Sequence, residues 1–381
     1  MTRPDRPEHS PEPAPAATLA ARLVAWYRSN ARSLPWRDDP SPYAVLLSEL
    51  MLQQTRVDTV IERFRRFLER WPTLADLAAA EEDEVLHEWA GLGYYARARN
   101  LHAAARAAHA VGGLPRDPKA LRRLPGLGPY TAGAIASIAF GVAAPLVDGN
   151  VERVLFRVDA RTEDPKTAAG KRALWARAAE LVACEEPSDL NQGLMELGAT
   201  VCSPRAPACP RCPWADLCAG RALGIAEDLP RRPPRKKPRP VRGAAGILRR
   251  DGAVLLGQRP GTGLLASLWE PVGADLASQE SASDGVRRAF LDRVSLEVGI
   301  TAHLGQIVHV FSHRRLTLEV FEVAVAGGDD PVAGGGYQAL RWVDPAAPGE
   351  VALSKLARRT LDLALEPPAQ TSLLAAEPSP E

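Results

Sequence analysis

One carboxylate stands in an otherwise apolar stretch near the start of the chain. Glu49 lies among Val, Leu and Met in PYAVLLSELMLQQTR, residues 42–56. The apolar residues around it recur at three- and four-residue steps, and so does Gln53, which predicts a helix with Glu49 and Gln53 on one face. An acid in such a place is either a buried structural partner or a catalytic acid with a raised pKa. This stretch alone leaves both interpretations open.

Four cysteines follow one another closely in the middle of the chain. They have the spacing Cys-x6-Cys-x2-Cys-x5-Cys and are Cys202, Cys209, Cys212 and Cys218. Thiolates this close, in a loop stiffened by prolines, can enclose one metal centre. Zinc would more often show two C-x2-C pairs separated by a longer insert. The spacing instead resembles the [4Fe–4S] loop of the endonuclease III superfamily of DNA glycosylases, whereas Cys184 lies outside the loop and is expected to be a small buried residue.

A tight turn joins two predicted helices in LRRLPGLGPYTAGAIASIAF, residues 121–140. Gly126 and Gly128 allow the backbone to approach a ligand closely, and Pro129 suits the first position of the second helix. The free N–H groups of a helix start can bind an anion. A helix-hairpin-helix of this form would bind DNA phosphate through its backbone, and a simple corner between two helices is the alternative. Backbone binding matters here because the formal net charge is only +1.

Two further segments carry candidate functional residues. Asp148 directly precedes a predicted helix in VDGNVERVLFR, residues 147–157, where an N-cap is the more common use of Asp. GLGYYARARN, residues 91–100, contains two tyrosines and two arginines, including Tyr94 and Arg97. Such residues can pack in a core, but on a DNA-binding face they contact phosphates and stack on or wedge between bases.

The 381 residues are enough for two domains, each with its own core. Helical periodicity covers 18–228, whereas alternating, strand-like segments and two helices cover 242–365. We therefore predict an all-α domain followed by an α+β domain. Residues 229–241 form a basic, proline-rich linker that is either a phosphate-binding strap or a soluble tether. Residues 1–17 and 366–381 are expected to be disordered tails.

Six motifs in order, from about Leu34 to Cys218, resemble those of adenine DNA glycosylases of the MutY type. They are LPWR (34–37), SELMLQQT (48–55), GLGYYARARNL (91–101), LPGLGPYTAGAI (124–135), DGNVERVL (148–155) and the cysteine loop. The resemblance implies a helix-hairpin-helix glycosylase fold with a [4Fe–4S] cluster. Its two helical parts would be a six-helix module at about 40–145 and an iron–sulfur subdomain at about 18–39 plus 146–228.

The resemblance also assigns roles to the candidate residues. Glu49 would donate a proton to the departing adenine and then activate water, while Asp148 would stabilise the oxocarbenium-like sugar. Tyr130 and Asn150 would support that step by hydrogen bonding. Gln53 would fill the gap in the duplex and Tyr94 would wedge beside the lesion. The expected substrate is double-stranded DNA with adenine opposite 8-oxoguanine or guanine.

Tyr130 separates two branches of the superfamily. Relatives with lyase activity that resemble endonuclease III carry a lysine there, whose amine forms a Schiff base with the sugar. Tyrosine cannot form an imine, so the sequence predicts a monofunctional glycosylase that leaves an abasic site. An endonuclease III-like pyrimidine glycosylase/lyase and a non-catalytic, cluster-bearing DNA-binding protein remain the rival hypotheses.

The C-terminal half resembles the Nudix-like domain that MutY proteins use to inspect the opposite base. A Nudix hydrolase holds Mg²⁺ with the carboxylates of an REUxEE helix, and DRVSLEVG, residues 292–299, lacks them. Pyrophosphatase activity is therefore not expected. Phe311, Ser312 and His313 match the family's loop that contacts 8-oxoguanine.

The remaining predictions concern partners and location. Gln370 to Leu374 resembles short peptides that dock on the bacterial sliding clamp. The chain shows no leader and no apolar run of membrane-spanning length, so we expect a cytoplasmic, bacterial and monomeric protein.

Overall fold

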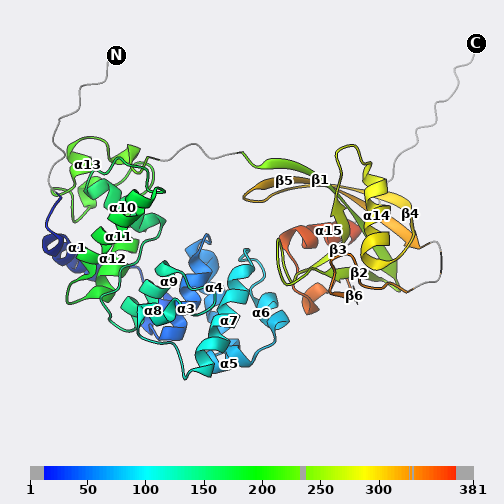
Figure 1. Ribbon diagram of the computed structural model, residues 1–381, viewed down its shortest axis with the longest axis horizontal. Coiled ribbons are helices and arrows are strands. Elements are labelled where there is room, and N and C mark those ends of the chain that lie inside the picture. The colour runs from blue at the N-terminus through cyan, green and yellow to red at the C-terminus, as the bar shows by residue number, and fades with distance from the viewer. Residues whose placement is uncertain (1–12, 232–236, 326, 328–329, 366–381) are drawn as a thin grey trace, which may run out of the picture. The chain divides into compact units, whose positions relative to one another are not determined.

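The computed structural model describes residues 13–231, 237–325, 327 and 330–365 (Figure 1). These residues divide into two compact units. A helical unit contains the residues up to Ala80 and those from Arg97 to the linker, and a second unit contains Glu81–Ala96 and the C-terminal part of the chain. The peptide of the predicted clamp contact, Gln370 to Leu374, lies outside the described residues.

The helical unit contains no strand among its described residues. Its helices are α1 (Ala16–Asn30), α2 (Pro35–Asp38), α3 (Pro42–Leu52), α4 (Val57–Arg70), α5 (Leu74–Ala79), α7 (Ala96–Ala110), α8 (Pro118–Leu121), α9 (Pro129–Ala134), α10 (Gly149–Val158), α11 (Ala168–Val182), α12 (Pro187–Thr200) and α13 (Ala219–Ala222). Three short segments complete it: η1 (Ile135–Ala139), η2 (Cys209–Arg211) and η3 (Ala226–Asp228). Several of these helices begin at a side-chain cap, as α3 does where the Ser41 hydroxyl accepts from the Ala44 N–H.

One core of the helical unit joins segments from both ends of the unit's sequence. Leu19 and Leu23 of α1 pack with Leu155 of α10 and Leu194 of α12, and all are fully buried. Trp214, in the cysteine loop, belongs to the same core, and its indole N–H donates to the Leu19 carbonyl at 2.9 Å. The cysteine loop is thereby anchored to α1.

Two predicted helices have different ends in the structure. The helix predicted over residues 42–56 stops at Leu52, and Gln54 adopts a left-handed φ of 59°. The helix predicted over 129–140 is α-helical only to Ala134 and then widens into the π-helical turn η1. There the Ser137 hydroxyl donates to the Gly133 carbonyl at 2.8 Å. Such π-turns occur frequently at functional sites.

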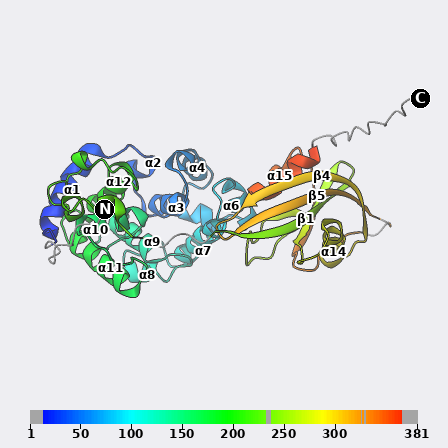
Figure 2. The ribbon, with the colours of Figure 1, turned by 90° about the horizontal axis from the view of Figure 1, so that it is seen from above.

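The second unit is built on a six-stranded mixed sheet in the order β4-β5-β1-β3-β2-β6 (Figures 1 and 2). Its strands are β1 (Arg239–Arg250), β2 (Ala253–Gln258), β3 (Trp269–Asp275), β4 (Val298–Val310), β5 (Arg314–Val325) and β6 (Ala339–Val343). α14 (Ala282–Val294) packs on one face and α15 (Lys355–Leu365) on the other, and η4 (Pro348–Glu350) precedes α15. Ile247 and Leu248, adjacent in β1, enter these two different cores, as alternation along a strand requires.

Residues 81–96 group with this sheet unit. Their helix is α6 (Glu82–Glu88), and its Val85 and Leu86 are fully buried together with Trp89. The Gln258 side-chain amide on β2 donates to Asp83 at 3.2 Å. β1 also begins earlier than predicted, because Arg239 to Val241 pair with β5 instead of belonging to the linker.

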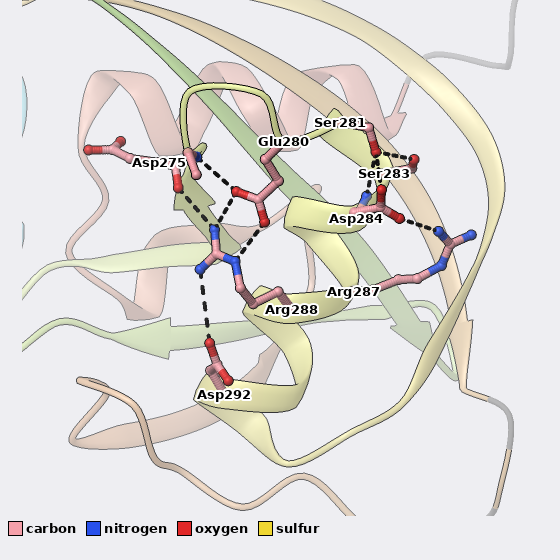
Figure 3. A network of polar contacts seen from close by, with 9 residues as sticks. Asp275, Glu280, Ser281, Ser283, Asp284, Arg287, Arg288 and Asp292 are labelled. Atoms are coloured by element: carbon pink, nitrogen blue, oxygen red, sulfur yellow. Dashed lines mark hydrogen bonds and ion pairs between the residues drawn. The ribbon is translucent and has the colours of Figure 1, made fainter.

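Carboxylates around α14 pair with arginines (Figure 3). Glu280 accepts two hydrogen bonds from Arg288, at 2.7 and 2.9 Å, and Asp284 accepts one from Arg287. Asp292, in the stretch that aligns with a Nudix motif, lies 3.9 Å from the Arg288 guanidinium. Glu280 and Asp284 therefore serve as ion-pair partners at the start of α14, and Asp292 lies near its end.

Candidate active site

The helical unit contains a cavity of about 520 Å³ that brings together four segments far apart in the sequence. Glu49 reaches it from α3, Tyr130 from α9, Asp148 and Asn150 from the start of α10, and Met195 and Glu196 from α12. Gln53 also lines it. All four residues predicted to be catalytic thus lie around one cavity.

Glu49 is an acid in a nearly dry environment. Glu49 is only 5% exposed, and this burial raises the pKa of its carboxyl to about 7. The Tyr130 hydroxyl donates a short hydrogen bond to Oε2 of Glu49 and opposes that rise, whereas the charge of Asp148 adds to it. Near neutral pH this carboxyl can therefore both donate and accept a proton.

Asp148 has a different environment, because it caps the N-terminus of α10. Its carboxylate accepts from the backbone N–H groups of Asn150 at 2.9 Å and Val151 at 2.7 Å, and from the Asn150 amide at 3.0 Å. Burial raises the pKa of Asp148, and these hydrogen bonds and the charge of Arg153 oppose the rise. The N-cap and the catalytic interpretations are compatible, since capping holds the charged carboxylate in the cavity.

Hydrogen bonds connect Asp148 to the cysteine loop. The side-chain oxygen Oδ1 of Asn150 accepts from Nη2 of Arg153 at 2.9 Å, and Nε of Arg153 donates to the backbone carbonyl of Cys202 at 2.7 Å. Arg157, one turn further along α10, donates to the Ser203 carbonyl at 2.7 Å and lies 3.4 Å from Sγ of Cys202. α10 therefore carries the catalytic-site carboxylate at its start and supports the cysteine loop along its length.

The four predicted cysteine ligands line one apolar cavity in that loop. Burial raises the pKa of Cys212 to about 12, and the proximity of Cys202, Cys218 and Cys209 adds to this rise. Thiolates grouped in this way need a cationic centre among them. Among the described residues, no three or more His, Cys, Asp or Glu side chains are placed to hold a metal ion. Four cysteines around one cavity would provide the thiolate ligands that an iron–sulfur cluster requires.

The predicted hairpin joins α8 to α9 through Gly126 and Gly128. Gly126 has a φ of 70°, and a Cβ there would lie 2.3 Å from Cβ of Asn100. Gly128 is the N-cap of α9, and a Cβ there would meet nothing within 4 Å. The first glycine is thus required by the fold, whereas the second leaves the exposed start of α9 open to a ligand.

Arg97 does not occupy the DNA-facing position predicted for it. It is 7% exposed, and its guanidinium donates to the carbonyls of Leu50 at 2.7 Å and Met51 at 3.0 Å, and to Oγ1 of Thr55 at 3.2 Å. A guanidinium on these carbonyls stabilises the end of α3. Arg97 therefore sets the turn that contains Gln53, which is the C-cap of α3 and not a residue on its face.

The predicted lesion-contacting residues lie in the sheet unit. Tyr94 is 51% exposed and has a left-handed φ of 48°. Phe311, Ser312 and His313 form the turn between β4 and β5, where the Phe311 N–H donates to the Arg314 carbonyl at 2.8 Å. Ser312 and His313 are exposed, and Phe311 packs between His309, 4.6 Å away between ring centroids, and the Arg314 guanidinium.

The sequence analysis missed Glu196, a second buried acid of the cavity. It is 1% exposed and pairs with Arg32 at 2.6 Å and Arg37 at 2.8 Å. It stands in the apolar run LMEL of α12, so the criterion that identified Glu49 could have found it. Arg153 was also missed, although its position three residues after Asn150 places both on one face of α10.

Comparison with known proteins identifies both parts of the chain. Residues 47–180 match the model of the HhH-GPD superfamily of base excision DNA repair proteins, and residues 243–363 match that of the NUDIX domain. The adenine DNA glycosylase of Homo sapiens is 40% identical over 80% of this chain and 66% of its own length. The adenine DNA glycosylase of Mus musculus is 38% identical over 86% of this chain and 75% of its own length.

Solved structures include a thermostable thymine-DNA glycosylase that is 29% identical, with a TM-score of 0.49, over 55% of this chain and 97% of that chain. No helix in the described part of the chain is both long and apolar enough to span a membrane. From the matches to its relatives over most of their length, the chain belongs to the adenine DNA glycosylase family, enzymes that hydrolyse the N-glycosyl bond of adenine in DNA during base excision repair.

Proposed function

We propose that this glycosylase removes adenine paired with 8-oxoguanine or guanine and leaves an abasic site without cutting the strand. The single observation that carries the proposal is the placement of Glu49 and Asp148 around one cavity in unlike environments. Glu49 is buried beside a tyrosine, whereas Asp148 receives three hydrogen bonds that favour its charged form. When the surroundings of two carboxyl groups favour opposite protonation states, the protonated group can act as an acid and the charged group as its anionic partner.

The reaction follows from these two environments. A base inside a duplex is out of reach, so adenine must leave the stack and enter the cavity. Protonated Glu49 donates its proton to a ring nitrogen of adenine, and the C–N bond breaks with its electron pair leaving on the base. The Asp148 carboxylate stabilises the positive charge that develops on the sugar.

Water completes the hydrolysis. Glu49, now a carboxylate, accepts a proton from water as the remaining hydroxide bonds to C1′ of the sugar. The Tyr130 hydroxyl stabilises the carboxylate form of Glu49, and the Asn150 amide keeps Asp148 oriented. Gln53, in the turn after α3, occupies the space that adenine vacates, and Tyr94 wedges beside the opposite base. Ser312 and His313 supply the polar groups that distinguish 8-oxoguanine from guanine.

Cys202, Cys209, Cys212 and Cys218 would hold a [4Fe–4S] cluster. Bound there, it would brace the loop that exposes Arg205 and Arg211, since a hydrolysis consumes no electrons. These arginines and the start of α9 provide phosphate contacts that do not depend on net charge.

The rival lyase function needs an amine in the cavity. Tyr130 holds that position with its hydroxyl bonded to Glu49. Incubation with borohydride and duplexes containing A opposite 8-oxoguanine, G or T separates the alternatives. We expect adenine release from the first two duplexes and no trapped covalent complex. Trapping, or release of a pyrimidine instead, would contradict the proposal, and the absence of any base release would favour a non-catalytic DNA-binding protein.

A further inference from the structure

The loop that presents Tyr94 has an unusual attachment. Gly91, Gly93 and Tyr94 all adopt left-handed φ values, of 95°, 69° and 48°. The indole N–H of Trp89 donates to the Gly93 carbonyl at 3.1 Å and closes the loop locally. A non-glycine residue in this region costs energy unless its surroundings hold it there. Contacts beyond the loop must therefore fix the backbone at Tyr94.

The adjacent residue provides such a contact. Tyr95 is 6% exposed, and its hydroxyl donates to the Leu353 carbonyl at 2.8 Å. Leu353 lies 258 residues further along the chain, in the segment that leads into α15. This is a buried hydrogen bond between the loop and the C-terminal part of the same compact unit.

Leu353 is itself tied to the sheet. It forms a parallel bridge with Trp269 at the start of β3, and the backbone N–H of Trp269 donates to the Ala352 carbonyl at 3.0 Å. β3 pairs with β1, and β1 pairs with β5, whose first residue directly follows His313. At that end the Arg239 N–H donates to the His313 carbonyl at 3.1 Å. A continuous ladder of backbone hydrogen bonds thus joins the Tyr95 contact to the Phe311–His313 turn.

We propose that Tyr95 is a positioning residue for opposite-base recognition: its hydroxyl fixes the Tyr94 loop to the same sheet that carries Phe311, Ser312 and His313. The wedge and the lesion-contacting turn then act as one preformed surface. The proposal rests on the function given above. Preorganisation of two contacts on one rigid support favours simultaneous binding of the correct lesion.

Tyr95→Phe tests the proposal, since it removes the hydroxyl and keeps the ring. The quantity to measure is the ratio of single-turnover rates for adenine opposite 8-oxoguanine and opposite guanine, in the full-length protein. We expect this ratio to fall about five-fold, the effect of one buried neutral hydrogen bond. A loss of stability alone would lower both rates together and leave the ratio unchanged.

Tyr337→Phe is the matched control. Its hydroxyl is also in the sheet unit and donates to Glu270 at 3.2 Å, and the Arg293 guanidinium lies over its ring. We expect this variant to keep the wild-type ratio. Gln258→Ala removes the hydrogen bond that joins β2 to Asp83 of α6. It should lower the ratio, as Tyr95→Phe does.

A double-mutant cycle gives the decisive outcome. If the wedge and the turn act together, Tyr95→Phe should have a smaller effect on the ratio once Ser312→Ala is present. A wild-type ratio in Tyr95→Phe, or strictly additive effects in the cycle, would overturn the inference alone. A wild-type protein that released adenine equally fast from both duplexes would also overturn the inference, whereas one that released adenine from neither duplex would overturn the proposed function.

Discussion

Glu49 shows how a single residue acquires its chemistry from distant parts of the chain. The spacing of 42–56 predicts a helix with an acid on its apolar face, and the structure confirms that Glu49 is buried in α3. Burial raises the pKa of Glu49 to about 7, and two groups that modify this value, Tyr130 and Asp148, lie 81 and 99 residues later. No local pattern contains that information, so only the family resemblance could connect the three residues beforehand.

The pH dependence of excision follows from the pKa of Glu49. Proton donation requires the protonated carboxyl, so the single-turnover rate should fall as the pH rises through about 7. The hydrogen bond from Tyr130 lowers this pKa. In Tyr130→Phe the rate should therefore begin to fall at a higher pH. Rate profiles of both proteins measure the shift. A fall in rate that occurs at the same pH or at a lower pH in Tyr130→Phe would show that Tyr130 does not act on Glu49.

The same burial should make folding stability depend on pH. The pKa of Glu49 is about 7 in the folded state and 4.5 for an exposed glutamate, so its contribution to stability is fully present below pH 4.5 and is lost as the pH rises through 7. Between pH 5 and pH 8 we expect it to lower the free energy of unfolding by about 2 kcal/mol. Glu49→Gln should lack this component. Urea unfolding of both proteins at the two pH values measures it, and parallel losses would contradict the assignment.

At the scale of elements, the sequence predicted the types of most helices and strands but not all their ends. α3 stops at Leu52 because Arg97, 47 residues beyond Leu50, holds its last carbonyls. The strand-like segments of the sequence are GAAGILRR, DGAVLLGQR, IVHVFSH, RLTLEVFEVAV and ALRWVD, and none of them is β3. Pro271 interrupts this short strand, which pairs with β1 and β2 in the interior of the sheet. Both features are set by tertiary contacts that override local preference.

The hairpin offers a matched pair of glycine substitutions. Gly126→Ala places a Cβ on Asn100 at a left-handed φ, so the free energy of unfolding should fall by about 2 kcal/mol. Gly128→Ala meets no atom in the protein and should keep stability, but its methyl group stands where α9 would receive a phosphate. We expect it to weaken binding of undamaged duplex by roughly five-fold.

Thermal unfolding and a DNA titration separate the two effects. Equal affinity of Gly128→Ala and wild type for DNA would show that the start of α9 is not a phosphate site. Undiminished stability of Gly126→Ala would contradict the close packing of the turn on α7, which carries Asn100.

At the scale of the whole molecule, the sequence predicted a helical part and an α+β part from the change in periodicity. It did not predict that residues 81–96 pack with the sheet, because their partners Gln258 and Leu353 lie 175 and 258 residues away. The helical periodicity of α6 is the same whichever core buries it. The division of the chain into two units separates the candidate residues by role. Glu49 and Asp148, proposed for catalysis, lie in one unit, and Tyr94 and Ser312, proposed for recognition of the opposite base, lie in the other.

The cysteine loop links the stability of the helical unit to its proposed cluster. Cys212→Ser should lower the iron content and the melting temperature together, because Trp214 and Arg157 tie this loop to α1 and α10. Cys184→Ser is the control, since Cys184 lies outside the cavity lined by the other four. Unchanged iron content in Cys212→Ser would contradict the proposal that this loop binds a cluster.

The central claim is that Glu49 and Asp148 together hydrolyse the N-glycosyl bond of adenine opposite 8-oxoguanine. The most direct measurement is the single-turnover rate of adenine release from that duplex by wild type, Glu49→Gln and Asp148→Asn, with binding of the duplex measured in parallel. We predict a loss of at least about 100-fold in rate for each variant, with duplex affinity retained. Release at the wild-type rate by Glu49→Gln would contradict the account.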